Sequence, residues 1–240
     1  MLNNTIRILS TRPLSNALLA TAAQKNIIIE AYSFIETVPT IGETEVAFIL
    51  QKSLEKAAVI FTSMNAVEAV IDALQNVKPD WNIYSMGGTT KTLVAIYFGA
   101  NSIKGTAKDA QSLAQSIINN HEQRVIFFCG NIRRDELPTL LNANQIQIEE
   151  LVVYDTIATP KSITKHYDAI IFYSPSAVES LFSNNTLSKE TVLFAIGKTT
   201  AKTIAHYTTN TIVISDSPEK EQLARKAVDY FEKEMQVSIK

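Results

Sequence analysis

Four short clusters of Ser, Thr, Asn and Gly each follow an apolar, β-branched segment and precede a stretch with helical periodicity. They are Thr62-Ser63-Met64-Asn65, Gly87-Gly88-Thr89-Thr90, Ser174-Pro175-Ser176 and Gly197-Lys198-Thr199-Thr200. Side chains of these types cap helices by accepting hydrogen bonds from free N–H groups. The same helix N-termini attract anions through unpaired N–H groups and the helix dipole. The clusters therefore predict either caps alone or sites for a ligand with several carboxylates or phosphates.

Two further strand ends add cations to this pattern. Cys129-Gly130-Asn131-Ile132-Arg133-Arg134 follows one apolar segment, and Thr11-Arg12-Pro13 follows the first. The arginines either contact a ligand or lie on a solvated helix surface, and the residue types leave both readings open. Cys129 has no histidine in an obvious partner position, so a buried thiol is favoured over a nucleophile.

Several classes of chemistry lack their motifs in this chain. There is no Walker A loop or Rossmann glycine fingerprint, which disfavours nucleotide binding, and no G-x-S-x-G elbow of a serine hydrolase. His121, His166 and His206 are scattered at expected helix ends and loops, so we expect ordinary surface histidines and no metal site.

Composition narrows the class of protein. The 240 residues carry a formal net charge of −2, whereas nucleic-acid binding usually shows as a basic surplus. Apolar runs stay far below the roughly 20 residues that span a bilayer, and the N-terminus lacks a signal-like apolar core. A single cysteine excludes an intrachain disulfide and favours a reducing, cytoplasmic setting. We expect a monomer that binds neither nucleic acid nor membrane.

The elements that must position these turns alternate along the chain. Strand-like segments are expected at 6–10, 27–34, 58–61, 82–86, 124–128, 146–154, 169–173, 191–196 and 211–214, with helices such as 65–75, 107–119, 176–182 and 220–234. Alternation of this kind predicts an α/β fold with parallel sheets. Ligands bind such sheets beyond the carboxyl ends of the strands, where the polar turns fall.

An internal repeat organises the chain. IFTSMNAVE at 60–68 recurs as IFYSPSAVE at 171–179, an offset of 111 residues, and GGTT at 87–90 and QSLA at 111–114 recur 110 residues later as GKTT and EQLA. Ile29-Glu30 reappears as Ile148-Glu149 at an offset of 119. Long extended segments at 27–37 and 146–156 follow Asn26 and Asn144, where we expect helices to end in left-handed geometry. We predict one domain from 1–35 plus 156–240 and another from 36–155, with crossover strands near 30–38 and 150–157.

The ordered series of motifs resembles the uroporphyrinogen-III synthases from end to end. The series consists of TRP at 11–13, IFTSMNAVEAV at 60–70, MGGTT at 86–90, GTAKDAQSLAQSI at 105–117, FFCGNIRRDELPTLL at 127–141, VVYDT at 152–156, FYSPSAV at 172–178 and AIGKTTAKTI at 195–204. Each motif is weak by itself, whereas the series is specific. Met64 departs from the family's usual proline, which Pro175 keeps in the second copy.

The resemblance implies two flavodoxin-like parallel-sheet domains joined by a two-stranded β-ladder, with the active site in a cleft. It implies a lyase of haem and porphyrin biosynthesis that needs no cofactor. The substrate would be hydroxymethylbilane, a linear tetrapyrrole rich in carboxylates. Loss of its terminal hydroxyl as water, attack at the substituted carbon of ring D and reclosure through a spiro intermediate would give uroporphyrinogen III with ring D inverted. The resemblance also makes transient contact with hydroxymethylbilane synthase an expectation.

The resemblance points to Tyr154, in the V-Y-x-T motif, as the catalytic residue. A phenol with an ordinary pKa near 10 can donate a proton to the departing hydroxyl or hold it by a hydrogen bond. The alternative is an amphipathic strand residue at the domain linker. The substrate-binding residues expected from the turns and from the family are Arg12, Thr62, Ser63, Asn65, Gly87, Thr90, Gly130, Asn131, Ser174, Ser176, Gly197, Thr199 and Thr200.

Two other functions compete with the synthase. A two-domain anion-binding or sensor module would close on its ligand without chemistry, and tight binding of unreacted hydroxymethylbilane would favour it. A receiver-like regulatory protein would need acidic phosphoacceptor residues after its first strand. That strand instead ends in Ser10-Thr11-Arg12-Pro13.

Overall fold

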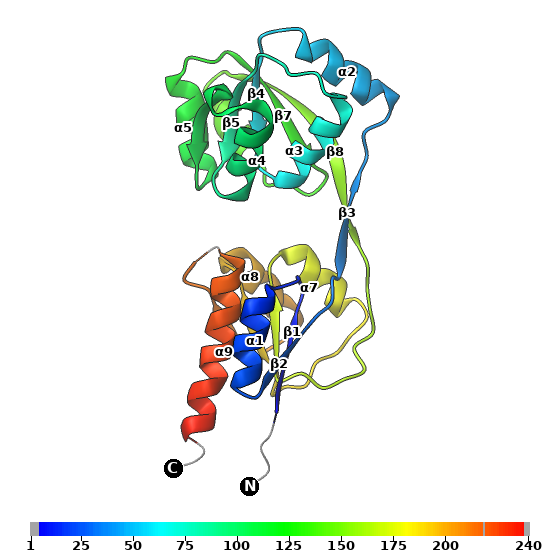
Figure 1. Cartoon of the computed structure of the whole chain (residues 1–240), viewed down its shortest axis with the longest axis vertical. Helices are drawn as coiled ribbons and strands as arrows, with labels where there is room; N and C mark the ends of the chain where they lie inside the picture. The colour runs from blue at the N-terminus through cyan, green and yellow to red at the C-terminus, as the bar shows by residue number, and fades with distance from the viewer. Residues whose placement is uncertain (1–4, 218, 238–240) are drawn as a thin grey trace. The chain divides into compact units, whose positions relative to one another are not determined.

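The structure, a computed structural model, describes residues 5–217 and 219–237. The chain divides into two compact units, unit 1 from Met1–Glu36 with Ile157–Lys240 and unit 2 from Thr37–Thr156. Each unit contains its own sheet with helices on both faces, as Figure 1 shows. The fold class expected from the sequence, α/β with two parallel-dominated sheets, is confirmed.

Unit 1 is built on a five-stranded sheet in the order β11-β10-β9-β1-β2, in which all neighbouring strands are parallel. The strands are β1 (Ile6–Ser10), β2 (Ile27–Ala31), β9 (Ala169–Phe172), β10 (Val192–Ala195) and β11 (Ile212–Ile214). The helices are α1 (Asn16–Gln24), α7 (Pro175–Phe182), α8 (Lys198–Tyr207) and α9 (Lys220–Val237).

The central strand β9 shows why this sheet is covered on both sides. Ala169 and Ile171 pack in a cluster with α1 and α9, whereas Ile170 and Phe172 pack with α7 and α8. All four side chains are buried. A strand buried on both faces is apolar throughout, because parallel sheets are sandwiched between helices.

Unit 2 is built on a six-stranded sheet in the order β3-β8-β7-β4-β5-β6. The strands are β3 (Ile35–Pro39), β4 (Ala58–Phe61), β5 (Asn82–Met86), β6 (Ile103–Ala107), β7 (Arg124–Gly130) and β8 (Gln147–Ala158). The helices are α2 (Glu43–Ser53), α3 (Met64–Ala73), α4 (Thr89–Phe98), α5 (Ala110–Asn119) and α6 (Glu136–Ala143), with a 3-10 turn at Ala100–Ser102. One core cluster lies under α2, α3 and α4, and another lies under α5 and α6.

The two strands that cross the unit boundary, β3 and β8, run antiparallel. The Thr159 N–H donates to the Phe34 carbonyl at 2.9 Å, and the Thr40 N–H donates to the Val153 carbonyl at 3.2 Å. With β3 at its edge, the sheet of unit 2 departs from a purely parallel arrangement.

The sequence repeat corresponds to a repeated topology. Strands β4, β5 and β6 match β9, β10 and β11, and strands β7 and β8 match β1 and β2, which follows the offsets of about 110 and 119 residues. Under this matching the sheet orders are the same, β6-β5-β4-β7-β8 in unit 2 and β11-β10-β9-β1-β2 in unit 1. The polar turns of the two copies therefore fall at equivalent strand ends.

Three local expectations were wrong. The extended segment at 27–37 is interrupted between β2 and β3, where Phe34 turns into the core of unit 1 and is fully buried. Strand β6 was not expected, because Lys104 and Gly105 break the apolar pattern of this edge strand. Asn26 takes left-handed geometry with φ 57° as expected, but at the second site Gln145, with φ 60°, does so in place of Asn144.

Candidate functional site

Tyr154 lies on β8 directly against the end of β7. Gly130 is its register partner, after an irregularity between Cys129 and Gly130. A Cβ atom at Gly130 would lie 2.5 Å from Cζ of Tyr154 and 2.8 Å from its hydroxyl oxygen. The phenol ring therefore covers the Cα of Gly130, and only glycine leaves room for it. Tyr154 is 8% exposed.

Asn131 fastens this end of β7 to β8. Its N–H donates to the Tyr154 carbonyl at 3.1 Å. Its Oδ1 accepts from the N–H groups of Ile132 and Thr156, each at 2.8 Å. The side-chain oxygen of Asn131 thus accepts from its own segment and from the residue two places after Tyr154 on β8. This arrangement gives Asn131 a positioning role that its sequence motif did not reveal.

The β4–α3 turn follows the neighbouring strand. Ser63 is the N-cap of α3, and its Oγ accepts from the Asn65 N–H at 3.2 Å. Thr62, Ser63 and Asn65 are partly buried. The predicted cap is confirmed, and the Ser63 hydroxyl keeps its own proton for donation to a ligand.

The β5–α4 turn holds a buried threonine. Thr90 is 5% exposed. The exposed Thr92, by contrast, donates to the Gly88 carbonyl at 3.1 Å. Gly87 is tied to β6 through its N–H, which donates to the Ala107 carbonyl at 2.8 Å. Of the two glycines in this turn, Gly88 has the positive φ, 70°. Gly88 was not among the expected site residues.

Because β8, β7, β4 and β5 are consecutive neighbours, their carboxyl-end residues follow one another along one edge of the unit 2 sheet. In order they are Gly130 with Asn131, the Thr62–Asn65 turn and the Gly87–Thr90 turn; Tyr154 lies level with them, because it pairs with Gly130, although β8 continues to Ala158. This edge combines a phenol, two helix N-termini and the largely buried residue Thr90. Such an arrangement is suited to binding carboxylates beside a proton donor.

Unit 1 presents the matching turns at the ends of β1, β9 and β10, which are also neighbours. Ser174 is the N-cap of α7; its Oγ accepts from the Ala177 N–H at 3.2 Å and lies 3.1 Å from the Ser176 Oγ. Thr200 is 2% exposed, and Thr199 lies exposed beside it in the first turn of α8. The exposed Arg12 forms no ion pair with another described residue.

Gly197 differs in backbone conformation from the glycines of the matching turn in unit 2, where Gly88 has a positive φ. It is the N-cap of α8 in extended geometry, with φ −175°, which any residue adopts. No heavy atom lies within 4 Å of a Cβ placed there. The local backbone therefore does not require glycine at this turn.

Two arginines follow β7. Arg133 is exposed and forms ion pairs with Asp135 and Glu150. Arg134 is exposed. Cys129 is buried as expected, and burial, with a smaller contribution from Glu150, raises the pKa of its thiol to about 11. A thiol of this kind is a poor nucleophile.

Other polar features lie away from these turns. His121, His166 and His206 are exposed, as expected. No group of three or more His, Cys, Asp or Glu residues suited to a metal ion occurs within residues 5–217 and 219–237.

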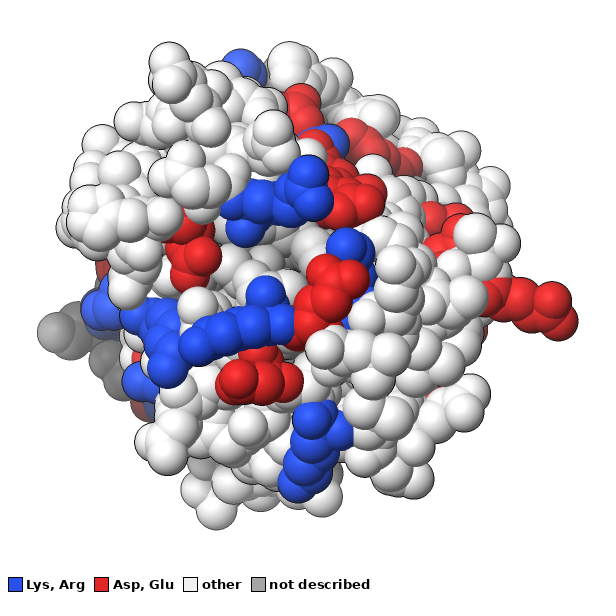
Figure 2. Space-filling view, turned by 90° about the horizontal axis from the view of Figure 1, so that it is seen from above, with Lys and Arg blue, Asp and Glu red and all other residues white. Residues whose placement is uncertain are grey.

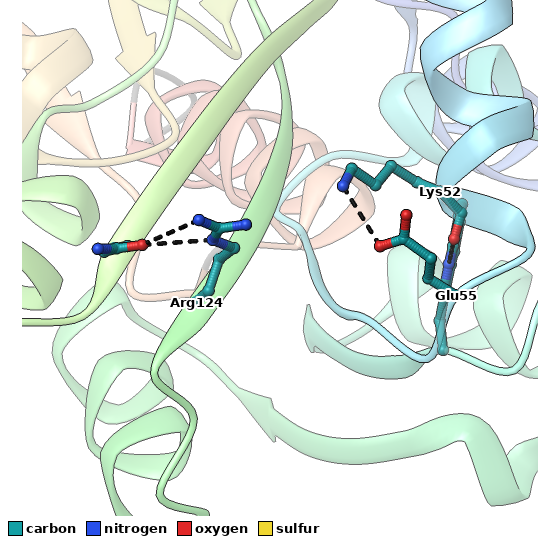
Figure 3. Close-up of polar contacts among 5 residues, drawn as sticks. Lys52, Glu55 and Arg124 are labelled. Atoms are coloured by element: carbon teal, nitrogen blue, oxygen red, sulfur yellow. Dashed lines mark hydrogen bonds and ion pairs between the residues drawn. The ribbon is translucent and has the colours of Figure 1, made fainter.

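A groove of about 520 Å³ lies at the opposite, amino end of β7 and β8. Its cations already have partners: Arg124 donates to the Gln147 Oε1 at 3.2 and 3.3 Å, and Lys52 pairs with Glu55 at 3.4 Å (Figure 3). Figure 2 shows a face on which Lys and Arg intermingle with Asp and Glu around a hollow. This face is not the uniformly basic surface typical of nucleic-acid binding.

Fold and site together define a class of protein: an α/β protein of two parallel-sheet units that both present polar turns at the carboxyl ends of their strands. The family model of uroporphyrinogen-III synthase HemD matches residues 16–225. The chain therefore belongs to the uroporphyrinogen-III synthase family, which confirms the resemblance seen in its motifs.

Solved structures share the fold at low sequence identity. Uroporphyrinogen-III synthetase from Helicobacter pylori is 17% identical with a TM-score of 0.67, over 94% of this chain and 99% of that one. A mutant uroporphyrinogen III synthase from the extremely thermophilic bacterium Thermus thermophilus is 13% identical with a TM-score of 0.63, over 94% of this chain and 98% of that one.

Proposed function

We propose that the chain catalyses the reaction of its family: the cyclisation of hydroxymethylbilane, with loss of water and inversion of ring D, to uroporphyrinogen III. Family membership over residues 16–225 supports the activity. The observation that carries the proposed chemistry is the Tyr154 phenol, held against Gly130 at the carboxyl edge of the unit 2 sheet.

In this proposal the polar turns bind the substrate's carboxylates. Ser63 and Ser174 offer hydroxyl protons at helix N-termini. Thr90 and Thr200, two largely buried residues, offer hydroxyls in the first turns of α4 and α8. Arg12 adds a full positive charge without an ion-pair partner among the described residues. The remaining expected residues, Thr62, Asn65, Gly87, Gly130, Asn131, Ser176, Gly197 and Thr199, shape or line the same turns. Hydrogen bonds to carboxylates are strong because the acceptor is charged.

Tyr154 acts on the leaving group. Its phenol donates a proton to the terminal hydroxyl, the carbon–oxygen bond breaks, and water leaves while the pyrrole nitrogen lone pair stabilises the cation. The substituted carbon of ring D attacks, and the spiro intermediate fragments and recloses with ring D inverted. A proton released as the pyrrole regains aromaticity returns to the phenolate. These steps need no metal or organic cofactor.

Geometry decides the product, because the free substrate closes by itself to the uninverted isomer. Holding several carboxylates at fixed turns restricts which carbon of ring D meets the cation. Positioning of this kind converts binding into selectivity and rate.

We further propose that the chain acts as a monomer in the cytoplasm and receives its unstable substrate in transient contact with hydroxymethylbilane synthase. The lone, buried Cys129 is compatible with a reducing compartment. Within residues 5–217 and 219–237, no helix has the length and apolarity that a membrane crossing requires.

A coupled assay tests the activity. Porphobilinogen and its deaminase generate hydroxymethylbilane in place, with and without this protein, and the oxidised porphyrin isomers are separated. We expect mainly the type III isomer only when the protein is present. Type I isomer in both tubes, from protein with folded circular dichroism, would reject the synthase and leave a binding module without catalysis.

A further inference from the structure

The loop between β1 and α1, residues 11–15, is fastened by the first turn of α9. The Lys220 Nζ donates to the Pro13 carbonyl at 2.7 Å. The Ser15 N–H and hydroxyl donate to the two carboxylate oxygens of Glu221 at 3.1 and 3.0 Å. These contacts join segments 206 and 207 residues apart, so they are tertiary contacts of unit 1.

The other end of the loop is fastened to the sheet. The N–H and the hydroxyl of Thr11 both donate to the Ile171 carbonyl, at 3.0 and 2.9 Å. The Ser10 hydroxyl donates to the Arg12 carbonyl at 2.5 Å. The backbone is therefore fixed on both sides of Arg12, while its guanidinium is exposed and lacks an ion pair among the described residues.

A carboxylate close to an anion-binding arginine is at first sight unfavourable. Tyr173 is the residue directly after β9. Besides burial, Glu221 raises the pKa of its hydroxyl and Arg12 lowers it, so both charges act on the same part of unit 1. A nearby negative charge weakens the attraction of an anionic substrate to Arg12. In the repeat of unit 2 the matching position is the uncharged Gln111. Glu221 has a second effect at this place, because both of its carboxylate oxygens accept hydrogen bonds from Ser15.

We infer that Glu221 is a positioning residue, which holds the loop of residues 11–15 so that Arg12 meets a carboxylate of the substrate. The inference rests on the proposed function for the identity of that substrate. Lys220 supports the same loop through Pro13. Glu221 itself does not contact the substrate; it acts through Arg12.

Whether KM rises or falls separates the two explanations of Glu221. A positioning role predicts that its loss raises KM, whereas charge repulsion of the substrate predicts that its loss lowers KM. We compare Glu221→Ala, Glu221→Gln and the matched control Glu219→Ala, which removes an equal charge from an exposed residue that bonds Gln222 and not the loop. In the coupled assay we expect Glu221→Ala to raise KM about 5- to 20-fold with kcat within about twofold. Glu221→Gln, whose amide oxygen still accepts from Ser15, should keep most of the affinity. Glu219→Ala should not raise KM.

A double mutant shows whether Glu221 acts through Arg12. In an Arg12→Ala background, Glu221→Ala should have little further effect on KM, because coupled residues are not additive. A fall in KM for both Glu221 variants would identify a mere charge effect and overturn the inference. Equal losses with and without Arg12 would also overturn it.

Direct binding of uroporphyrin III keeps this test independent of turnover. Tryptophan-fluorescence titration should show weaker binding for Arg12→Ala and Glu221→Ala, but not for Glu219→Ala. If the wild-type protein lacks synthase activity yet shows this pattern, the proposed function fails and the positioning role stands. If turnover is normal and all variants bind alike, the positioning role fails alone.

Discussion

At the residue scale, Tyr154 is fixed by its neighbours before any ligand binds. Its ring covers Gly130, its carbonyl accepts from the Asn131 N–H, and the next-but-one residue, Thr156, donates to the Asn131 side chain. A pre-organised proton donor does not have to be ordered during the reaction, which lowers the entropic part of the barrier.

Replacing Tyr154 by phenylalanine removes the proposed proton donor and keeps the ring. We expect Tyr154→Phe to lower kcat about 100-fold or more, the usual effect of losing a general acid, with uroporphyrin III binding within about twofold. The coupled assay and fluorescence titration measure the two effects. A variant with full kcat would assign the tyrosine to the strand alone, and loss of far-UV circular dichroism would show a structural role.

The contact between Gly130 and the phenol makes a second prediction. Gly130→Ala places a methyl group 2.5 Å from Cζ of Tyr154, so the ring or the strand end must move. We expect a loss of about 1–3 kcal/mol in the free energy of unfolding, typical of overpacking, and a large loss of kcat. Urea denaturation measures the first quantity.

Gly197→Ala is the matched control. Its backbone is extended, and a Cβ added there meets no heavy atom within 4 Å. Its free energy of unfolding should stay within about 0.5 kcal/mol of the wild type or rise slightly. Equal destabilisation by both alanines would contradict the packing described for Tyr154.

At the scale of elements, the sequence predicted strands and turns better than backbone conformation. The Ser63 and Ser174 caps follow from residue type. A short polar side chain between an apolar run and a helix can accept a hydrogen bond from a free N–H group of the helix's first turn. The glycine turns do not: Gly88 takes positive φ, whereas Gly197 is extended. That difference depends on how each strand approaches its helix, which the paired GGTT and GKTT motifs do not encode.

Tertiary contacts explain the other elements that sequence analysis missed. The break before β3 exists because Phe34 is buried in unit 1, while residues 35–39 continue beside β8. The engagement of Asn131 with Thr156 also depends on a strand that is distant in sequence. Neither contact can be predicted from the local sequence pattern.

Asn131 allows a test of the β7–β8 connection. Asn131→Ala removes the acceptor of two N–H groups, and we expect the unfolding free energy to fall by about 1 kcal/mol, with a lower kcat because Tyr154 is held less firmly. Asn131→Asp keeps the acceptor oxygen and should retain both stability and kcat. If the residue instead bound substrate carboxylates through its amide nitrogen, Asn131→Asp would raise KM strongly by charge repulsion.

At the scale of the whole molecule, each described core cluster draws its buried residues from a single unit. The clusters under α1 with α9 and under α7 with α8 belong to unit 1, and the other two belong to unit 2. Only β3 and β8 carry the chain from one unit to the other. Stability is therefore expected to be organised by unit, with separate unfolding transitions.

Trp81, the single tryptophan, makes this organisation measurable. It is 1% exposed in the core of unit 2, where its indole N–H donates to the Lys52 carbonyl at 2.9 Å, so its fluorescence reports unit 2. Leu113→Ala in unit 2 and Leu193→Ala in unit 1 each truncate a fully buried leucine, a change that costs about 2–5 kcal/mol. We expect Leu113→Ala to lower the temperature of the Trp81 transition. Leu193→Ala should leave that transition in place while far-UV circular dichroism shows earlier partial unfolding. If both variants lower the Trp81 transition equally, the units unfold as one cooperative body, and coupling through β3 and β8 outweighs the separation of their cores.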